Sequence, residues 1–234
     1  MSESVVEAPW SVVLSGYGRM GAAVEQEVSR SSDFEIVSHS LSSASDCDSV
    51  DVVIDFSHAS CLEDVINFAL SRQSALVVGT TGFADDQMHH LEECASQIPV
   101  LYAANFSLGI NVIVEQLGLL SNALQPMARE VVISDKHHVH KKDSPSGTAL
   151  WLSSLLPVKH RIESVREGEE VGEHRITWFC DDEEVVLSHR AFSRNVFAKG
   201  ALHATRWLLE KRKACVSERF CGMYTMQDVL REAK

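Results

Sequence analysis

Short apolar runs alternate with helix-like apolar periodicity along roughly the first 100 residues of the chain. The runs are almost continuously apolar, which is typical of strands that are covered on both faces of a sheet. They span 11–15, 34–39, 50–56, 75–79 and 99–103. Apolar residues recur at helical spacing within 20–28, 62–70 and 88–98. Strands that alternate with helices predict a parallel sheet with crossover helices.

The pattern changes after Asn105. The elements expected there are, in order, a helix over 108–124, a strand at 131–134, a helix over 146–156, strands at 175–180 and 185–192, a helix from near Asn195 and a last helix at 226–231. Strands that are grouped after helices, rather than alternating with them, indicate an α+β unit.

A basic segment stands out between the two patterns. The formal net charge of the chain is -12, yet Lys136 to Lys142 contain three Lys, three His and no acid. Such a local inversion of charge concentrates anions. The segment leads into Ser144-Pro145-Ser146-Gly147-Thr148, which resembles the start of a helix, and the free N–H groups of a helix N-terminus also bind anions. The combination predicts a site that binds a small acid and moves a proton.

Composition excludes several classes of protein. The 234 residues include 33 acids against 21 Lys and Arg, so there is no general basic surface for nucleic acid. No apolar run approaches the roughly 18 residues of a membrane span, and the first ten residues lack the pattern of a secretory signal. The six Cys form no C-x-x-C pair, which favours buried thiols in a reducing compartment over disulfides. We therefore expect a soluble cytoplasmic protein.

The run Gly16-Tyr17-Gly18-Arg19-Met20-Gly21 is a G-x-G-x-x-G motif between the first expected strand and the first expected helix. The first Gly permits the turn, the second lets a pyrophosphate approach the backbone, and the third lets helix and strand pack closely. A glycine turn in any such unit could produce the motif by itself. Its place in the pattern favours binding of a dinucleotide.

The adenosine ribose of a bound dinucleotide is normally held by an acid about 20 residues further on, at the end of the second strand. That place reads His39-Ser40-Leu41-Ser42 and contains no acid. Without a carboxylate there is no repulsion of a 2′-phosphate. The sequence therefore favours NADPH, or use of both NADPH and NADH.

Three further segments follow expected strands at their carboxyl ends, where open parallel sheets bind ligands. They are Asp55-Phe56-Ser57, Gly79-Thr80-Thr81-Gly82 and Ala103-Ala104-Asn105-Phe106-Ser107. Each alone could be only a turn. Together, at one edge of the sheet, they favour a wall of the cofactor site.

His137, His138 and His140 could also suggest a metal site. Their spacing does not resemble that of a catalytic zinc helix, and the adjacent lysines would repel a dication. A merely solvated basic loop is the other alternative. Acid and anion-binding functions fit the segment better, so no metal is expected.

Eight segments resemble, in order and approximate spacing, the 4-hydroxy-tetrahydrodipicolinate reductase family of lysine and diaminopimelate biosynthesis, also called dihydrodipicolinate reductases. They are GYGRMG, VVIDFS, VVGTTGF, AANFSLGIN, HHVHKKDSPSGTA, SVREGEEVGEH, SRNVFAKGA and YTMQDVL. The resemblance implies an α/β fold: a Rossmann-type parallel-sheet dinucleotide-binding domain, 1–107 with 195–234, and an α+β substrate-binding and oligomerisation domain with a mainly open sheet, 108–194. It also implies a homotetramer.

The resemblance further implies functions for single residues. His137 would be the proton donor or acceptor and Lys141 a second proton donor. The substrate carboxylates would be bound by His138, Gly147 and Thr148. The nicotinamide cofactor, NADPH or NADH, would be held by Gly16, Tyr17, Gly18, Arg19, Met20, Gly21, Gly79, Thr80, Thr81, Ala103, Ala104, Asn105 and Phe106.

The chain departs from the family pattern in three places. Its glycine loop is one residue shorter than the common G-x-x-G-R-M-G form, the acid after the second strand is absent, and the region 156–172 is short. The first two leave the choice between NADPH and NADH open. The third could trim the substrate domain or its interface without changing the catalytic segment.

The chemistry of the residues agrees with this resemblance. Hydride addition to a conjugated C=C–C=N system builds negative charge, which an imidazole and a nearby ammonium can meet with a proton. Two rivals remain: another dehydrogenase of an amino-acid pathway with the same fold, and a nucleotide-sensing module that has lost its chemistry. The presence of both His137 and Lys141 argues against the sensor.

Overall fold

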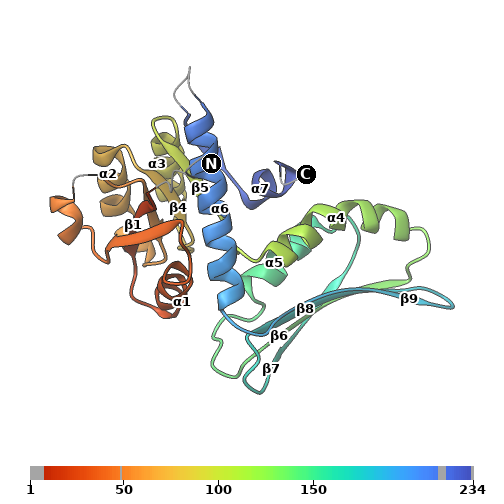
Figure 1. Cartoon of the computed structure of the whole chain (residues 1–234). Coiled ribbons are helices and arrows are strands. Elements are labelled where there is room, and N and C mark those ends of the chain that lie inside the picture. Colours follow the sequence, from red (N-terminus) through yellow and green to blue (C-terminus); the bar gives the residue numbers. More distant parts are fainter. Residues whose placement is uncertain (1–7, 48, 216–219, 233–234) are drawn as a thin grey trace, which may run out of the picture. The chain divides into compact units, whose positions relative to one another are not determined.

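A six-stranded parallel sheet organises the first of two units in the computed structural model, which describes residues 8–47, 49–215 and 220–232 (Figure 1). This unit comprises 1–106 and 197–234. Its strands are β1 (Trp10–Ser15), β2 (Phe34–Ser38), β3 (Val52–Asp55), β4 (Ala75–Val78), β5 (Pro99–Tyr102) and β10 (Gly222–Tyr224), in the order β10-β5-β4-β3-β1-β2. The helices are α1 (Arg19–Val28), α2 (Leu62–Arg72), α3 (Asp85–Ala95), α6 (Asn195–Ala214) and α7 (Met226–Glu232), with short 3-10 turns at Ser43–Asp46 and Ala59–Cys61.

Both faces of this sheet are buried because its strands are apolar at successive positions. Val13 and Val53 pack with α2 and α3 in one cluster, whereas Val12 and Val52, which point to the opposite face, are also fully buried. On that opposite face α1 contacts β1 and β2. The order of strands reverses between β1 and β3, and such a reversal opens a ligand crevice at the carboxyl ends of the strands.

The second unit, 107–196, is built on a four-stranded sheet in the order β7-β6-β8-β9. Its elements are α4 (Leu108–Leu124), β6 (Glu130–His137), α5 (Gly147–Leu155), β7 (Arg161–Arg166), β8 (Gly172–Phe179) and β9 (Glu184–Ala191). β6 pairs in parallel with β7 and antiparallel with β8, so the sheet is mixed. Helices α4 and α5 lie along one face, over a core that includes Trp178 (Figure 1). Parallel and mixed sheets in two units confirm the predicted fold class.

Several expected element bounds are wrong, each for a physical reason. α3 begins at Asp85 rather than near Met88, because two acids favour the first turn of a helix. β6 extends to His137 instead of ending at Ser134, because neighbours pair with it on both edges. β7 was not expected, since its sequence RIESVR is mostly polar. β10, with three residues, is too short to give a pattern.

No helix among the residues that the structure describes is both long enough and apolar enough to cross a membrane.

Candidate active site

The basic segment begins on a strand and ends on a helix. His137 is the last residue of β6 and is buried, and Gly147 is the first residue of α5. Between them, His138 donates its backbone N–H to Glu170 O at 2.9 Å, and Lys141 donates its own to His138 O at 3.1 Å. The sheet therefore positions the imidazole of His137, while the following loop leads to the N-terminus of α5.

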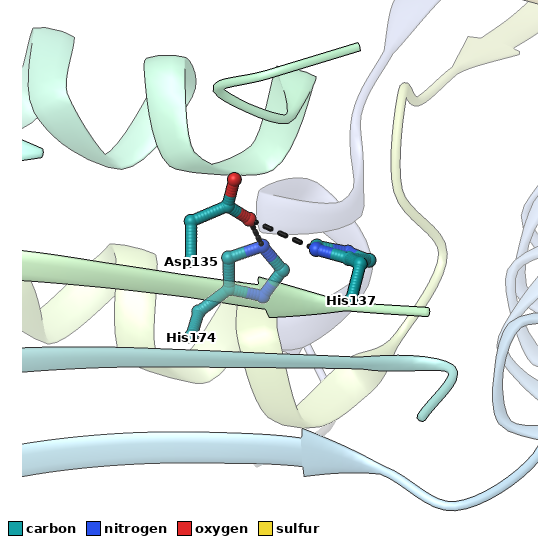
Figure 2. Close-up of side chains that lie close together, drawn as sticks. All are labelled: Asp135, His137 and His174. Carbon is teal, nitrogen blue, oxygen red and sulfur yellow. Dashed lines mark ion pairs between the residues drawn. The ribbon is translucent and has the colours of Figure 1, made fainter. Parts of the chain in front are cut away.

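His137 belongs to a buried cluster with Asp135 and His174 (Figure 2). Oδ1 of Asp135 lies 3.0 Å from Nδ1 of His137 and 3.3 Å from Nε2 of His174. The two imidazole rings meet nearly edge to face, with centroids 5.1 Å apart. Asp135 and His174 face each other directly across the β6–β8 pair, so the register of the sheet creates the cluster.

The three side chains are close enough to hold a metal ion, but their hydrogen bonds favour another interpretation. The Arg166 guanidinium donates to Oδ2 of Asp135 at 2.9 Å and already balances the charge of the carboxylate. A dication beside that guanidinium would be repelled. We therefore interpret the cluster as two imidazoles held beside one carboxylate rather than as a metal site, and it is a different set from His137, His138 and His140.

The N-terminus of α5 already binds a carboxylate, that of Asp143. Ser146 caps the helix, its Oγ accepting the N–H of Ala149 at 3.1 Å. The Asp143 carboxylate accepts the Gly147 N–H and pairs with Lys141 Nζ at 2.9 Å. Burial raises the pKa of the Asp143 carboxyl, but these partners outweigh it and hold the pKa below its usual range. Lys141 and the N-terminus of α5 therefore have the chemistry of an anion-binding site.

The charge of the basic segment is more strongly compensated than the sequence suggests. Lys136 pairs with Glu167 at 2.7 Å and with Glu170 at 3.4 Å, and both acids come from the turn after β7. Lys141 pairs with Asp143, as described above. Lys136 and Lys141 therefore bind carboxylates of the chain itself, and their charges are already paired.

The glycine loop has the geometry that a bound pyrophosphate needs. Gly16 has φ +109°, and a Cβ added there would lie 2.3 Å from the O atom of Phe56, the residue that follows β3. A Cβ on Gly21 would lie 1.9 Å from Gly16 O, so helix and strand pack as closely as the motif predicts. At Gly18, the N-cap of α1, a Cβ would meet nothing within 4 Å, and no side chain caps the helix. The helix N-terminus is thus open to an anion, and the residues fit a dinucleotide.

A cavity of about 600 Å³ lies beside this loop. Its lining includes Gly16, Tyr17 and the four residues His39 to Ser42, which follow β2 as the sequence predicts. Two acids that sequence reasoning missed lie nearby: Asp64 of α2 lines the cavity, and Glu25 of α1 approaches His39 Nε2 at 3.4 Å. Carboxylates reach this place from helices rather than from the end of β2.

The other expected cofactor segments follow β4 and β5. Thr80 is buried, and its Oγ1 donates to Oδ2 of Asp55 at 2.5 Å, which ties the segment after β4 to the end of β3. Phe106 is buried and meets Phe56 edge to face at 5.6 Å. Thr81 and Ala104 are exposed, Gly79 and Asn105 are half-buried, and Ala103 is buried. Thr80 and Phe106 are therefore buried packing residues at this edge of the sheet.

Two models of one protein family together match nearly the whole chain. A family model described as dihydrodipicolinate reductase, N-terminus, matches residues 10–106, and one described as dihydrodipicolinate reductase, C-terminus, matches residues 109–230. The chain belongs to the dihydrodipicolinate reductase family. The predicted resemblance is thereby confirmed.

Named dihydrodipicolinate reductases resemble this family member over nearly their whole length. The 4-hydroxy-tetrahydrodipicolinate reductase of Rickettsia africae (strain ESF-5) is 34% identical over 244 residues, which cover 94% of this chain and 98% of that protein. The enzyme of the same name from Caldanaerobacter subterraneus subsp. tengcongensis is 31% identical, covering 92% and 95%. A solved structure of dipicolinate-bound dihydrodipicolinate reductase from Paenisporosarcina sp. TG-14 has a TM-score of 0.74 at 20% identity, covering 93% of this chain and 97% of that one.

Three residues of the site were not predicted from the sequence: Asp135 and His174 of the buried cluster, and the half-buried Arg166 that pairs with Asp135. Arg166 and His174 belong to the motif SVREGEEVGEH, which contributes to the resemblance but was given no chemical function. Asp135 stands two residues before His137, and side chains two apart on a strand share a face. With β6 extended to His137, that spacing would have placed both side chains together.

Proposed function

We propose that this chain reduces 4-hydroxy-tetrahydrodipicolinate to tetrahydrodipicolinate with NADPH or NADH, the reductase step of lysine and diaminopimelate biosynthesis. The observation that carries the proposal is the segment 137–148, which combines a buried imidazole with a carboxylate partner, an ammonium and an anion-binding helix end. Loss of the 4-hydroxyl as water leaves a conjugated ring, which then takes up one hydride and one proton.

The glycine loop 16–21 would hold the pyrophosphate of the cofactor on the N-terminus of α1, and Gly79 to Thr81 with Ala103 to Phe106 would line the rest of its site. The open N-cap at Gly18 and the adjoining cavity support the assignment of the glycine loop. NADPH or NADH supplies the hydride when it is bound.

His137 would donate the proton to the atom on which negative charge builds, and Lys141, the second proton donor that the resemblance implies, would stabilise that charge or deliver the proton in place of His137. One substrate carboxylate would bind His138 and the lysine side. The other would bind the Gly147 N–H and the Thr148 hydroxyl at the start of α5. The Asp143 carboxylate, which accepts the Gly147 N–H and pairs with Lys141, supports this assignment because it shows that these groups hold carboxylates.

The proposed function predicts NADPH oxidation, followed at 340 nm, when the enzyme meets substrate freshly made by the synthase that forms it. Pyridine-2,6-dicarboxylate, a flat dicarboxylate without the reducible bond, is expected to inhibit competitively against the substrate. The inhibitor should bind because the groups that bind the two carboxylates do not contact the bond that is reduced. Absence of turnover, or no competition at millimolar inhibitor, would contradict a dicarboxylate reductase.

NADPH is expected to serve at least as well as NADH, because no acid stands among His39 to Ser42. Leu41→Glu introduces a carboxylate into that lining and should shift the ratio of kcat/KM values toward NADH about ten-fold, which corresponds to about 1.4 kcal/mol. Leu41→Gln is the matched control, since Leu41 also packs against the core and Gln changes the packing without adding charge. A strong preference of the unmodified enzyme for NADH would instead indicate that Asp64 or Glu25 performs the discrimination.

We also propose that the chain forms a homotetramer through the open face of the second sheet. α4 and α5 cover the other face. Val132, Thr177 and Val186 lie opposite one another in the register of the sheet, and of these three Val186 is exposed. Charges on the open face pair internally, as Arg190 does with Glu173. A sheet face whose charges pair within the chain is suited to a copy of itself.

We propose that the enzyme is cytoplasmic. All six Cys are free thiols, which fits a reducing compartment.

A further inference from the structure

Asp135 is a fully buried carboxylate that the proton transfer proposed above does not use. Its Oδ2 accepts hydrogen bonds from Ser146 N at 2.8 Å, Arg166 Nη2 at 2.9 Å and Ser164 Oγ at 3.2 Å, and its Oδ1 accepts from Ser146 Oγ at 2.7 Å. A buried charge is costly unless donors compensate for it. Donors from β7 and from the start of α5 therefore fix both oxygens in place.

The carboxylate stays ionised because of these donors. Burial by itself raises the pKa of Asp135, but the hydrogen bonds of His137, His174 and Ser146 outweigh burial and hold the pKa far below its usual range. A permanent negative charge thus lies next to the imidazole of His137.

The two nitrogens of His137 have different surroundings. Nδ1 is shielded from solvent and lies 3.0 Å from Asp135 Oδ1, although its N–H bond is not aligned as in an ideal hydrogen bond. Nε2 lies beside Gly172, where an added Cβ would be only 2.7 Å away. Because Nδ1 is buried, a proton that passes between His137 and the substrate must use Nε2. The absence of a side chain at Gly172 leaves room at that nitrogen.

His174 also contacts Oδ1 of Asp135, the oxygen that lies beside Nδ1 of His137. Ser146 Oγ has one proton, which it donates to Asp135, so its contact of 3.1 Å with His174 Nε2 must be donated by the imidazole. His174 therefore carries a proton on Nε2, 3.3 Å from Asp135 Oδ1. The same Ser146 caps α5, which couples the carboxylate to the helix end proposed to bind the substrate.

We propose that Asp135 is the positioning residue of the proton donor: it holds the proton of His137 on Nδ1, so that Nε2 faces the substrate, and His174 keeps the shared oxygen in place. The proposal rests on the proposed reductase function only for its kinetic consequence. The tautomer of His137 is a property of the free enzyme and can be measured without turnover.

The direct test is ¹⁵N NMR of histidine-labelled enzyme at a pH where the ring is neutral, with the His137→Ala spectrum as assignment. We expect the proton of His137 on Nδ1 in the unmodified enzyme and a shift of the population toward Nε2 in Asp135→Asn. Where a carboxylate fixes the tautomer of a catalytic imidazole, its conversion to an amide lowers kcat by up to about 10⁴. We expect a loss of about 10² to 10³ in kcat for Asp135→Asn, with less than a three-fold change in the KM for substrate.

Two more variants separate positioning from folding. His174→Gln should lower kcat by about ten-fold, because the amide can still donate to the shared oxygen but less rigidly. His160→Gln is its matched control: this imidazole of the same unit bonds Ser153 Oγ at 2.6 Å, away from the cluster, and kcat should not change.

Failure of the proposed reductase function and failure of the positioning function of Asp135 would give different results. An inactive unmodified enzyme would contradict the proposed function alone, because the tautomer can still be read. An Nε2-protonated His137 in the unmodified enzyme, or an Asp135→Asn variant that keeps kcat within three-fold, overturns the positioning function. If Asp135→Asn does not fold, the tautomer in the unmodified enzyme and the kcat of His174→Gln decide the question.

Discussion

Replacing His137 with alanine is expected to lower kcat by about 10² to 10⁴, the contribution typical of a positioned general acid. The KM for substrate should change far less, because the proton is needed in the transition state and not for binding. The expected site of donation is Nε2, since Nδ1 is buried against Asp135. Steady-state kinetics with NADPH and substrate measures both constants.

Two features make this substitution informative. His137 is buried at the end of β6, so the fold of the variant must be compared with the unmodified enzyme by near-UV circular dichroism. His160→Ala serves as control, because it removes an imidazole of the same unit that is bonded to Ser153. A His137→Ala enzyme with near-normal kcat would show that another group is the acid, with Lys141 as the first candidate.

The residues of the site that could be predicted from the sequence are those that lie close together along the chain. His137, His138, Lys141, Gly147 and Thr148 fall within twelve positions, and local rules for charge and helix starts suffice to notice them. The glycine loop was recognisable for the same reason, because a strand, a turn and a helix follow one another directly.

The remaining residues depend on pairing between distant strands. Asp135 meets His174 through the antiparallel register of β6 and β8, 39 positions apart along the chain (174 − 135). Arg166 reaches Asp135 from β7, a strand whose polar sequence gave no sign of pairing with β6. No local pattern specifies which residue of one strand faces which residue of another, and a shift by one residue would turn every side chain to the other face. The contacts of His174 and Arg166 with Asp135 could be found only from the structure.

The acids near the cofactor cavity illustrate the same limit. The acid that binds the ribose is normally expected at the end of β2, and the residues there are His39 to Ser42, none of which is an acid. Asp64 and Glu25 approach from α2 and α1, which the sheet order and helix packing bring beside that strand end. Absence of an acid from one segment therefore does not mean its absence from the cavity.

Gly172→Ala is expected to lower kcat by about 10², although it adds only a methyl group and removes no polar atom. The new Cβ would lie 2.7 Å from Nε2 of His137, closer than real Cβ contacts allow, and 3.0 Å from its Cδ2. The ring is held through Nδ1 by Asp135, so relief of the contact must displace the imidazole from the orientation in which Nε2 reaches the substrate. Misplacement of a catalytic group by about 1 Å can cost about 10² in rate.

The matched control for this substitution is Gly118→Ala in α4, where an added Cβ meets nothing within 4 Å. That variant should keep the kcat of the unmodified enzyme and gain up to about 1 kcal/mol in free energy of unfolding, since Ala is the better helix former. Gly172→Ala should keep its KM for NADPH, because no residue of the glycine loop is changed, while kcat falls. If kcat stays within a factor of three, the chain relaxes around residue 172 without moving His137, and the space beside Nε2 is not what that glycine provides.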